Sequence, residues 1–373
     1  MNTTTSVTIM TLITFLLAAL VAIAMAAMPW VADRRECFGV SVPSSAHTDD
    51  QVRGLKRAYA AAVSMAAVIM IVIAALMWWR RGAVSAMVIM TVAMLLQLPV
   101  GFAAQQICRR HMLTLKHEHG WKTDSSRRTV LVGERMPRPL GLTWELLHVP
   151  ALAVTLVVGN LGYSDMPQRV PMHMNAAGEI DSWVDKSPIL IWYAVGLQLM
   201  LAVLMTVSHL VLLHAKKPIN PNRPVSSAYA YGVFLKVWSV YLIVAGPLVA
   251  MGIGLGLQLS MIGVVGLDMI GLIMMVVAVA ALAAAVMIGL IYGQNGSRVY
   301  AASRADDDRD AASDDDRHWK AGVFYWNPDD PAVMVPKRFG VGWTCNFARP
   351  LTWVIMLALM ALCLGSIAFA VMI

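Results

Sequence analysis

Eight long apolar segments divide this chain, and its basic residues gather in every second connection between them. Of the 29 Lys and Arg residues, 25 lie in the first, third, fifth and seventh connections. An apolar run of about 18 residues or more is long enough to cross the hydrocarbon core of a bilayer as a helix. Because basic residues beside such helices stay in the cytoplasm, the pattern predicts a multi-pass membrane protein with both termini outside.

The composition favours the same class. Hydrophobic residues make up 58% of the chain and charged residues 14%, whereas a soluble domain carries about 25% charged residues. We therefore expect an all-α fold, a polytopic membrane helix bundle with about eight transmembrane helices. The expected spans cover residues 6–28, 58–79, 83–106, 141–162, 188–212, 231–252, 268–292 and 351–372. Gly252, Gly254 and Gly256 predict the turn between the sixth and seventh spans.

The connections divide the chain into five regions. We expect an N-terminal four-helix membrane region (1–162), an outer loop with its following helix (163–212), membrane helices six and seven (213–293), a cytoplasmic module (294–350) and a last transmembrane helix (351–373). The net charge of +7 follows from the bias of basic residues toward the cytoplasm and from their attraction to anionic lipid headgroups. The lipid bilayer, and not a nucleic acid, is the expected partner.

Two polar segments carry specific motifs. Residues 166–186 contain Pro-x-His-x-Asn followed by Gly-x-x-Asp-x-Trp, and this segment resembles the DUF1648 family of membrane proteins. Residues 315–350 contain Trp-Lys-x-Gly, Tyr-x-Asn-Pro-Asp-Asp-Pro and Arg-Phe-Gly-x-Gly-Trp, and they resemble the DUF5808 module. The pairing implies a bacterial protein of the cell (plasma) membrane.

The resemblance to DUF1648 also implies a class of function. The best-understood relatives of that family are immunity proteins, which protect a Bacillus-type producer from its own sporulation-delay toxin and sequester a repressor at the membrane. By this resemblance, the outer loop would recognise an envelope-active peptide, such as an antimicrobial peptide or toxin, or a stress signal. The inner loops would then signal to a cytosolic regulator.

The outer loop and one acid near the outer end of the seventh span supply the candidate ligand-binding residues. They are His173, Asn175, Gly178, Glu179, Asp181, Trp183 and Asp268. Residues 176–179 are expected to form a turn of this loop, with Gly178 at a positive φ. His173 and Asn175 would hydrogen-bond the loop backbone, bind a peptide, or join the carboxylates around a metal ion. An acid inside a span usually faces a partner or a cavity, so Asp268 would pair with Lys186 or lie at the interface.

An inner group of polar residues gives the alternative, enzymatic hypothesis. Glu145 and His148 are three residues apart at the start of the fourth span, so they share a helix face. His209 lies at a similar depth on the antiparallel fifth span. A carboxylate and two imidazoles suit Zn²⁺ as a cofactor and would leave a position for water. The three residues would then be the catalytic ligands of a membrane-embedded hydrolase or protease, or else a hydrogen bond that joins two helices.

The inner segment supplies the candidate residues of the cytoplasmic module. They are Trp319, Tyr325, Asn327, Asp329, Asp330, Arg338, Phe339, Trp343 and Asn346. The segment is too short for a core of its own, so its aromatic side chains are expected on the helices or at the lipid interface. The acidic run 306–316 before it is expected to be a solvated linker.

The sequence as a whole favours a non-enzymatic membrane protein of the immunity or sensing type, without a cofactor. The chain contains no His-Glu-x-x-His and no Gly-x-Ser-x-Gly motif, which are the local signs of a zinc protease or a serine hydrolase. A zinc-dependent hydrolase is the alternative. A small-solute transporter comes third, because the spans show weak internal symmetry and no clear central site.

Overall fold

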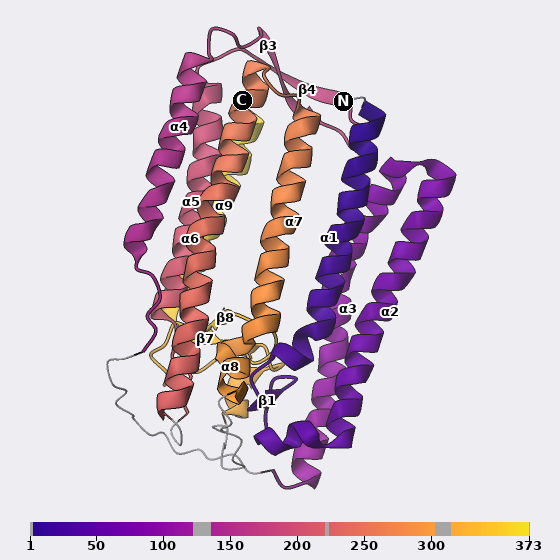
Figure 1. Ribbon diagram of the computed structural model, residues 1–373, viewed down its shortest axis with the longest axis vertical. Helices are drawn as coiled ribbons and strands as arrows, with labels where there is room; N and C mark the ends of the chain where they lie inside the picture. Colours follow the sequence, from indigo (N-terminus) through magenta and orange to yellow (C-terminus); the bar gives the residue numbers. More distant parts are fainter. Residues whose placement is uncertain (1–2, 122–135, 221–223, 303–314, 373) are drawn as a thin grey trace.

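The structure, a computed structural model, describes residues 3–121, 136–220, 224–302 and 315–372. Within these ranges eight helices are long and apolar enough to span a membrane, which confirms the all-α polytopic bundle (Figure 1). The long helices are α1 (Thr3–Val31), α2 (Asp50–Arg81), α3 (Ala83–Glu118), α4 (His148–Leu161), α5 (Ile189–His214), α6 (Pro224–Ile262), α7 (Leu267–Tyr292) and α9 (Pro350–Met372). A 3₁₀ helix at Leu142–Leu147 extends α4, and α8 (Ser297–Ala302) is one short helix after α7.

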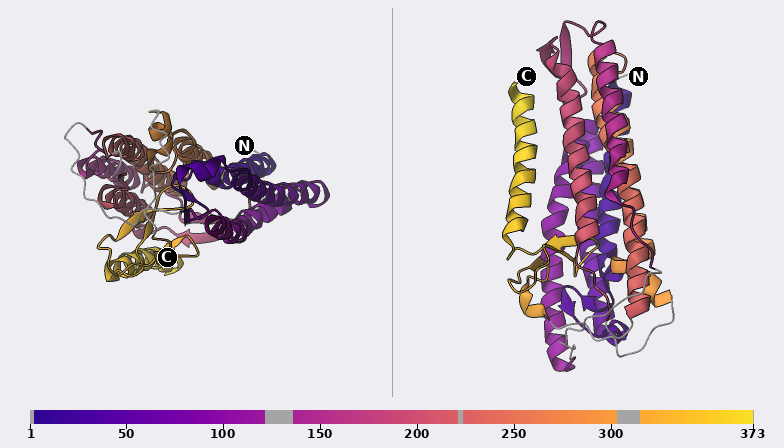
Figure 2. Two further views of the ribbon diagram at one scale, coloured as in Figure 1. Left: turned by 90° about the horizontal axis from the view of Figure 1, so that it is seen from below. Right: turned by 90° about the vertical axis from the view of Figure 1, so that its left-hand side faces the viewer.

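The long helices form two groups. Helices α1, α2 and α3 pack against one another, and α4, α5 and α6 form a second three-helix group. Helix α7 lies between the groups in contact with α1 and α6, while α9 lies at the edge of the bundle against α5 (Figures 1 and 2). Each group is held mainly by contacts between helices that follow one another along the chain, as is usual for consecutive elements.

Short hairpins lie at both ends of the bundle. The described strands pair as β1 (Glu36–Cys37) with β2 (Val40–Ser41), β3 (Arg169–Met174) with β4 (Ile180–Asp185), β5 (Trp319–Lys320) with β6 (Phe324–Tyr325), and β7 (Met334–Pro336) with β8 (Trp343–Cys345). The β3–β4 hairpin lies at the same end as both chain termini (Figure 1). We call this the hairpin end. The opposite end carries residues 315–346, which we call the module, and is called the module end.

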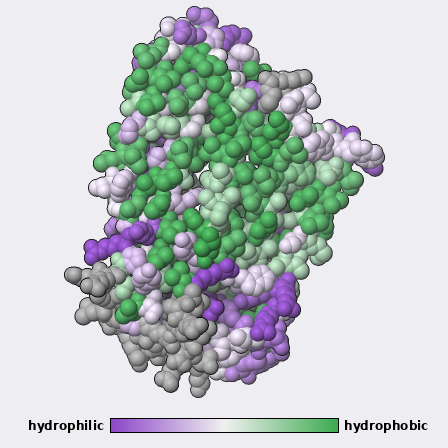
Figure 3. Space-filling model, viewed as in Figure 1, coloured by the Kyte–Doolittle hydropathy of each residue, from purple (hydrophilic) through white to green (hydrophobic). Residues whose placement is uncertain are grey.

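The surface between the two ends is apolar. Large hydrophobic side chains cover the middle of the molecule and polar residues gather at its ends (Figure 3). Leu95 and Val68, for example, are exposed by 65% and 58%. A soluble protein rarely exposes so large a contiguous apolar area. This apolar surface, which we call the apolar belt, therefore faces the hydrocarbon of the bilayer.

Helix α6 corrects one prediction. The glycines at 252, 254 and 256 were expected to form the turn between two spans, but α6 continues through them to Ile262. The turn lies at 263–266, where Gly263 has a φ of 83°. Gly254 instead lies directly against the Gln198 side chain of α5. Glycine inside a membrane helix serves close helix packing, so a glycine cluster alone did not identify the turn.

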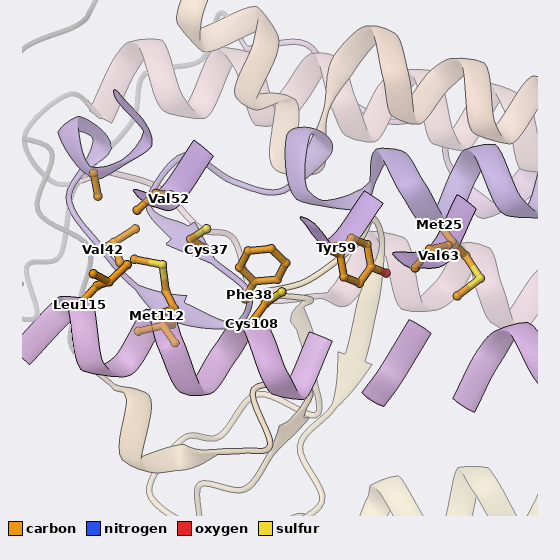
Figure 4. Packing of buried hydrophobic residues seen from close by; sticks show 12 residues of the cluster. Met25, Cys37, Phe38, Val42, Val52, Tyr59, Val63, Cys108, Met112 and Leu115 are labelled. Atoms are coloured by element: carbon orange, nitrogen blue, oxygen red, sulfur yellow. The ribbon is translucent and has the colours of Figure 1, made fainter. Parts of the chain in front are cut away.

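A buried core at the module end joins α1, α2 and α3 to the β1–β2 hairpin (Figure 4). Phe38, Tyr59 and Met112 are each at most 1% exposed. Phe339 of the module packs on this core, with its ring centroid 5.7 Å from that of Phe38 and 5.4 Å from that of Tyr59. The first helix group and the module therefore share one apolar contact.

Candidate functional site

The loop between α4 and α5 folds as the β3–β4 hairpin. Val170 pairs with Val184 and Pro171 with Trp183. Since side chains alternate along a strand, Val170 and Val184 point to one face, where they pack with Met261 of α6 in a small core. Trp183 belongs to the other face and is 45% exposed. The hairpin thus covers the helix ends with one face and leaves the other open.

The polar motif residues of the loop hold the hairpin turn. The Asn175 side-chain oxygen accepts hydrogen bonds from the amides of Ala177 (2.9 Å) and Glu179 (3.0 Å), and its amide donates to the Glu179 carboxylate (3.1 Å). His173 Nδ1 lies 2.5 Å from Asp181 Oδ1 across the two strands. Asn175 thus hydrogen-bonds the loop backbone, as the first interpretation held, whereas His173 pairs with a side chain of the loop.

Gly178 connects the turn to α1. Its φ is 83°, as the sequence predicted for a turn residue, and a side chain there would clash with Thr3 and approach Val7 of α1. Glycine is favoured on both counts, because it tolerates positive φ and allows a close backbone approach. The hairpin therefore contacts the first helix group through its turn and the second through its buried face.

Asp268 does not pair with Lys186. It accepts a hydrogen bond from Ser6 of α1 at 2.6 Å, whereas the Lys186 ammonium donates to the carbonyls of Ser164 and Met166 and lies over the Tyr163 ring. The first of the two alternatives for Asp268, a pair with Lys186, was wrong because Lys186 already donates to backbone carbonyls after α4. Asp268 instead joins α7 to α1 at the hairpin end.

The structure brings Glu145, His148 and His209 together at the other end of the second helix group. His209 Nδ1 lies 2.7 Å from Glu145 Oε1, and its Nε2 lies 3.0 Å from the Leu140 carbonyl. His148 Nε2 lies 3.3 Å from Glu145 Oε2, although neither His148 ring nitrogen makes a hydrogen bond. All three side chains are buried.

This arrangement does not fit a zinc site as it stands. A zinc ligand must direct a ring nitrogen lone pair at the metal, but both nitrogens of His209 face other groups. Across the described residues, no group of three His, Cys, Asp or Glu side chains has the spacing to hold a metal ion. The geometry is that of a hydrogen-bonded contact between helices, in which Leu140 is held in turn by Ser239 of α6.

The module has a small interior of its own, against expectation. Trp319, Tyr325 and Val335 are buried together, and Asn346, with no exposed area, donates to the carbonyls of Asn327, Asp330 and Ala332. Burial raises the pKa of Asp330, but hydrogen bonds from Lys216, the Ala332 amide and Tyr325 outweigh it and lower the pKa overall. Polar bonds to the backbone replace the large core that so short a segment lacks.

Most of the module residues predicted from the motif are structural. Asn327, Asp330, Arg338 and Asn346 are buried, whereas Asp329 is exposed. Phe324 and Trp326, which the sequence analysis did not single out, are each 50% exposed. Phe324 packs edge-to-face with Phe347, and Phe347 packs in the same way with Trp353 of α9. These rings form an aromatic row typical of a membrane interface.

The module contacts both helix groups. Only three residues lie between Phe339, which packs in the first group, and Trp343, whose ring centroid lies 5.7 Å from that of Phe234 in α6. Gln294, after α7, holds the backbone of residues 337–342. Its side-chain nitrogen donates to the carbonyls of Lys337 and Gly342, and its side-chain oxygen accepts from the amide of Gly342. The module therefore bridges the helix groups at one end as the hairpin does at the other.

A charged cluster lies at the centre of that bridge. The Arg338 guanidinium contacts Asp315, Asp316 and Glu36, the last at 3.4 Å, and lies over the Trp319 ring. Asp316 also accepts from Lys116 at 2.7 Å. The acidic run was expected to be a solvated linker, but these two aspartates are ion-paired; residues 303–314 lie outside the described residues. No sequence motif marked Glu36, which reaches Arg338 only through tertiary packing.

Glu36 responds to this environment. Desolvation by the surrounding protein raises the pKa of Glu36 to about 8, although Arg338 acts in the opposite direction and Asp33 and Asp316 add to the rise. Burial disfavours the charged form of a carboxyl group more than the Arg338 guanidinium favours it here. Glu36 therefore holds its proton near neutral pH.

Comparison with known proteins supports both resemblances. Residues 151–199 match DUF1648, a domain of unknown function, and residues 328–353 match DUF5808, a family of unknown function. Both family resemblances are thereby confirmed. Nothing matches among the curated proteins or the solved structures.

Proposed function

We propose that the protein belongs to a bacterial plasma membrane and is of the immunity or sensing type. It binds an envelope-active peptide on the open face of the β3–β4 hairpin and passes the bound state to a cytosolic regulator. The observation that supports this proposal is that the polar residues of the hairpin and its exposed Trp183 have different roles. Asn175 and the His173–Asp181 contact hold the fold, so Trp183 and its neighbours are left for recognition.

The open face has the chemistry of a peptide-binding surface. Trp183 lies across from Pro171 in the strand register, and Arg169 across from Asp185. Trp and Arg are enriched among residues that dominate binding energies at interfaces. An amphipathic peptide at the bilayer surface would meet an aromatic side chain, with a basic and an acidic group beside it.

Helix α1 supports the second part of the proposal. Its first turns contact the hairpin turn at Gly178. Beyond its last residue, the chain enters β1, where Glu36 meets Arg338 of the module. A shift of the hairpin turn would therefore be transmitted to the module through α1, which is one continuous helix.

The distribution of charge supports the orientation. Arg35, Lys116, Lys216 and Arg338 all lie at the module end, where each pairs with an acid. Basic residues at helix ends mark the cytoplasmic side. The hairpin end and both termini would therefore face outward, and the module would face the cytosol.

A protection assay tests the proposal. A peptide-sensitive bacterial strain would express the wild type, Trp183→Ala or Trp79→Ala at equal membrane levels, and be challenged with a panel of secreted amphipathic peptides. Trp79 is 82% exposed at the end of α2 and is the matched control. The wild type and Trp79→Ala should protect against at least one peptide, and Trp183→Ala should lose about tenfold or more of that protection. Equal protection by Trp183→Ala, or no protection by the wild type, would refute it.

A further inference from the structure

A cavity of about 250 Å³ opens beside the module at the membrane surface. Its lining comes from α1, α2, α3 and the module. The side chains that the argument uses are Met25, Leu98, Phe102, Lys337, Arg338 and Phe339. Leu98 and Phe102 are exposed by 60% and 45%, so the cavity is open toward the apolar belt.

The basic end of the cavity is electrostatically unbalanced. Arg338 faces carboxylates on Glu36, Asp315 and Asp316. For the Lys337 ammonium, by contrast, no ion pair and no side-chain hydrogen bond is found among the described residues. Its side chain is exposed at the protein surface, yet nearby protein atoms desolvate the ammonium and lower the pKa of Lys337. A cation in this position gains from an anion that the protein does not supply.

We propose that this cavity is a binding site for one phospholipid with an anionic headgroup, taken from the bilayer leaflet at the module end. The phosphate of a headgroup that carries no cation of its own pairs with Lys337, and the upper part of an acyl chain lies along Met25, Leu98 and Phe102. The polarity of the cavity matches that of a lipid in this leaflet. Its charged end lies at the module and its apolar end points toward the middle of the bundle.

The lining favours a lipid over a soluble phosphate. A free phosphate would use the Lys337 ammonium and leave the apolar wall exposed, whereas a lipid chain buries that wall as well. Juxtamembrane Lys and Arg each contribute about 1 kcal/mol to attraction by anionic lipid, which is about fivefold in affinity. The headgroup charge and the chain are thus both needed for selective binding.

Native mass spectrometry of the full-length protein tests the site. The detergent-solubilised protein is titrated with phosphatidylglycerol, phosphatidylcholine, glycerol 3-phosphate or inorganic phosphate. We compare the wild type with Lys337→Gln, with Leu98→Trp, which fills the cavity from its exposed wall, and with Lys217→Gln. Lys217 is exposed at the same end but does not line the cavity, so its variant controls for lost charge.

The proposal predicts one retained phosphatidylglycerol in the wild type and in Lys217→Gln. Lys337→Gln should weaken that complex about fivefold or more, Leu98→Trp should abolish it, and thermal unfolding of both variants without lipid should stay near that of the wild type. Equal retention of phosphatidylcholine would overturn the proposal, as would undiminished binding by Lys337→Gln. Binding of either soluble phosphate as tightly as the lipid would overturn it too, since the apolar wall would then be unused.

Discussion

Arg338 lies almost fully buried between the two helix groups, with 3% of its side chain exposed. A guanidinium keeps its charge under all physiological conditions and offers several donors in a fixed plane. Asp315, Asp316 and Glu36 supply the acceptors. The motif identified Arg338, but Glu36 lies about 300 residues earlier in a two-residue strand. Its role could be found only from the packing of β1 against the module.

The first prediction concerns Glu36 and pH. Its pKa is about 8 in the folded protein against 4.5 as the ordinary value, so the folded state binds the proton more tightly than the unfolded state. The stabilisation is complete below pH 4.5 and is lost as the pH rises toward 8. Glu36→Gln should flatten the fall of the melting temperature over this window, as measured by thermal unfolding in detergent. Glu118→Gln, at an exposed position, should keep the wild-type profile, and identical profiles for both variants would contradict the assignment.

The second prediction concerns the contact between Glu145 and His209. Removing the carboxylate in Glu145→Ala leaves the buried Nδ1 of His209 without its partner. Interhelical polar contacts in membranes are worth about 1–2 kcal/mol at most, so unfolding in detergent should require that much less free energy. Because both His209 nitrogens are engaged, elemental analysis of the wild type should find no stoichiometric zinc. One zinc per chain, lost in Glu145→Ala, would restore the hydrolase hypothesis.

At the scale of elements, the sequence predicted the spans better than the connections. Each predicted span corresponds to a long helix, because hydrophobic length is set by the bilayer. The β3–β4 hairpin was expected only as an ordered loop, since its strands carry polar residues, Met and Pro without a clear period-two pattern. The turn at Gly178 was predicted because positive φ has a local signature. The position of the turn after α6 was not predicted correctly, because glycine also allows close packing between helices.

The third prediction concerns the hairpin turn. Asn175→Ala removes three side-chain hydrogen bonds, two of them to backbone amides. The free energy of local opening of β3 and β4 should therefore fall by about 1–3 kcal/mol, and their amides should exchange faster. His173→Ala removes a single exposed contact and should have a smaller effect. Hydrogen–deuterium exchange of residues 169–185 measures both. Equal exchange in the two variants would contradict the role given to Asn175.

The fourth prediction concerns the attachment of the module. Phe339→Ala removes the ring that contacts Phe38 and Tyr59. The substitution should lower the free energy of unfolding by about 3 kcal/mol, the lower end of the range for a buried Phe. Phe324→Ala, at a half-exposed position, is the matched control and should change stability little. Proteolysis of the module in membranes should accelerate only in the first variant. Unchanged proteolysis there would show that Phe339 does not hold the module.

At the scale of the whole molecule, two helix groups are joined at both ends by small polar elements. The hairpin contacts α1 through Gly178 and the second group through Val170 and Val184. The module contacts the first group through Phe339 and the second through Trp343. The sequence predicted an outer and an inner polar segment, but their common bridging role depends on tertiary contacts. Motifs therefore located these segments without revealing how they are linked.

The most direct test of this account is hydrogen–deuterium exchange of the full-length protein in nanodiscs, with and without a peptide against which it protects. Binding at the hairpin should lower exchange in 169–185 and also change it in β1 and in module residues 319–346. In Trp183→Ala both changes should vanish, while the Trp79→Ala variant keeps them. Protection confined to the hairpin, with β1 and the module unaltered, would contradict transmission through α1.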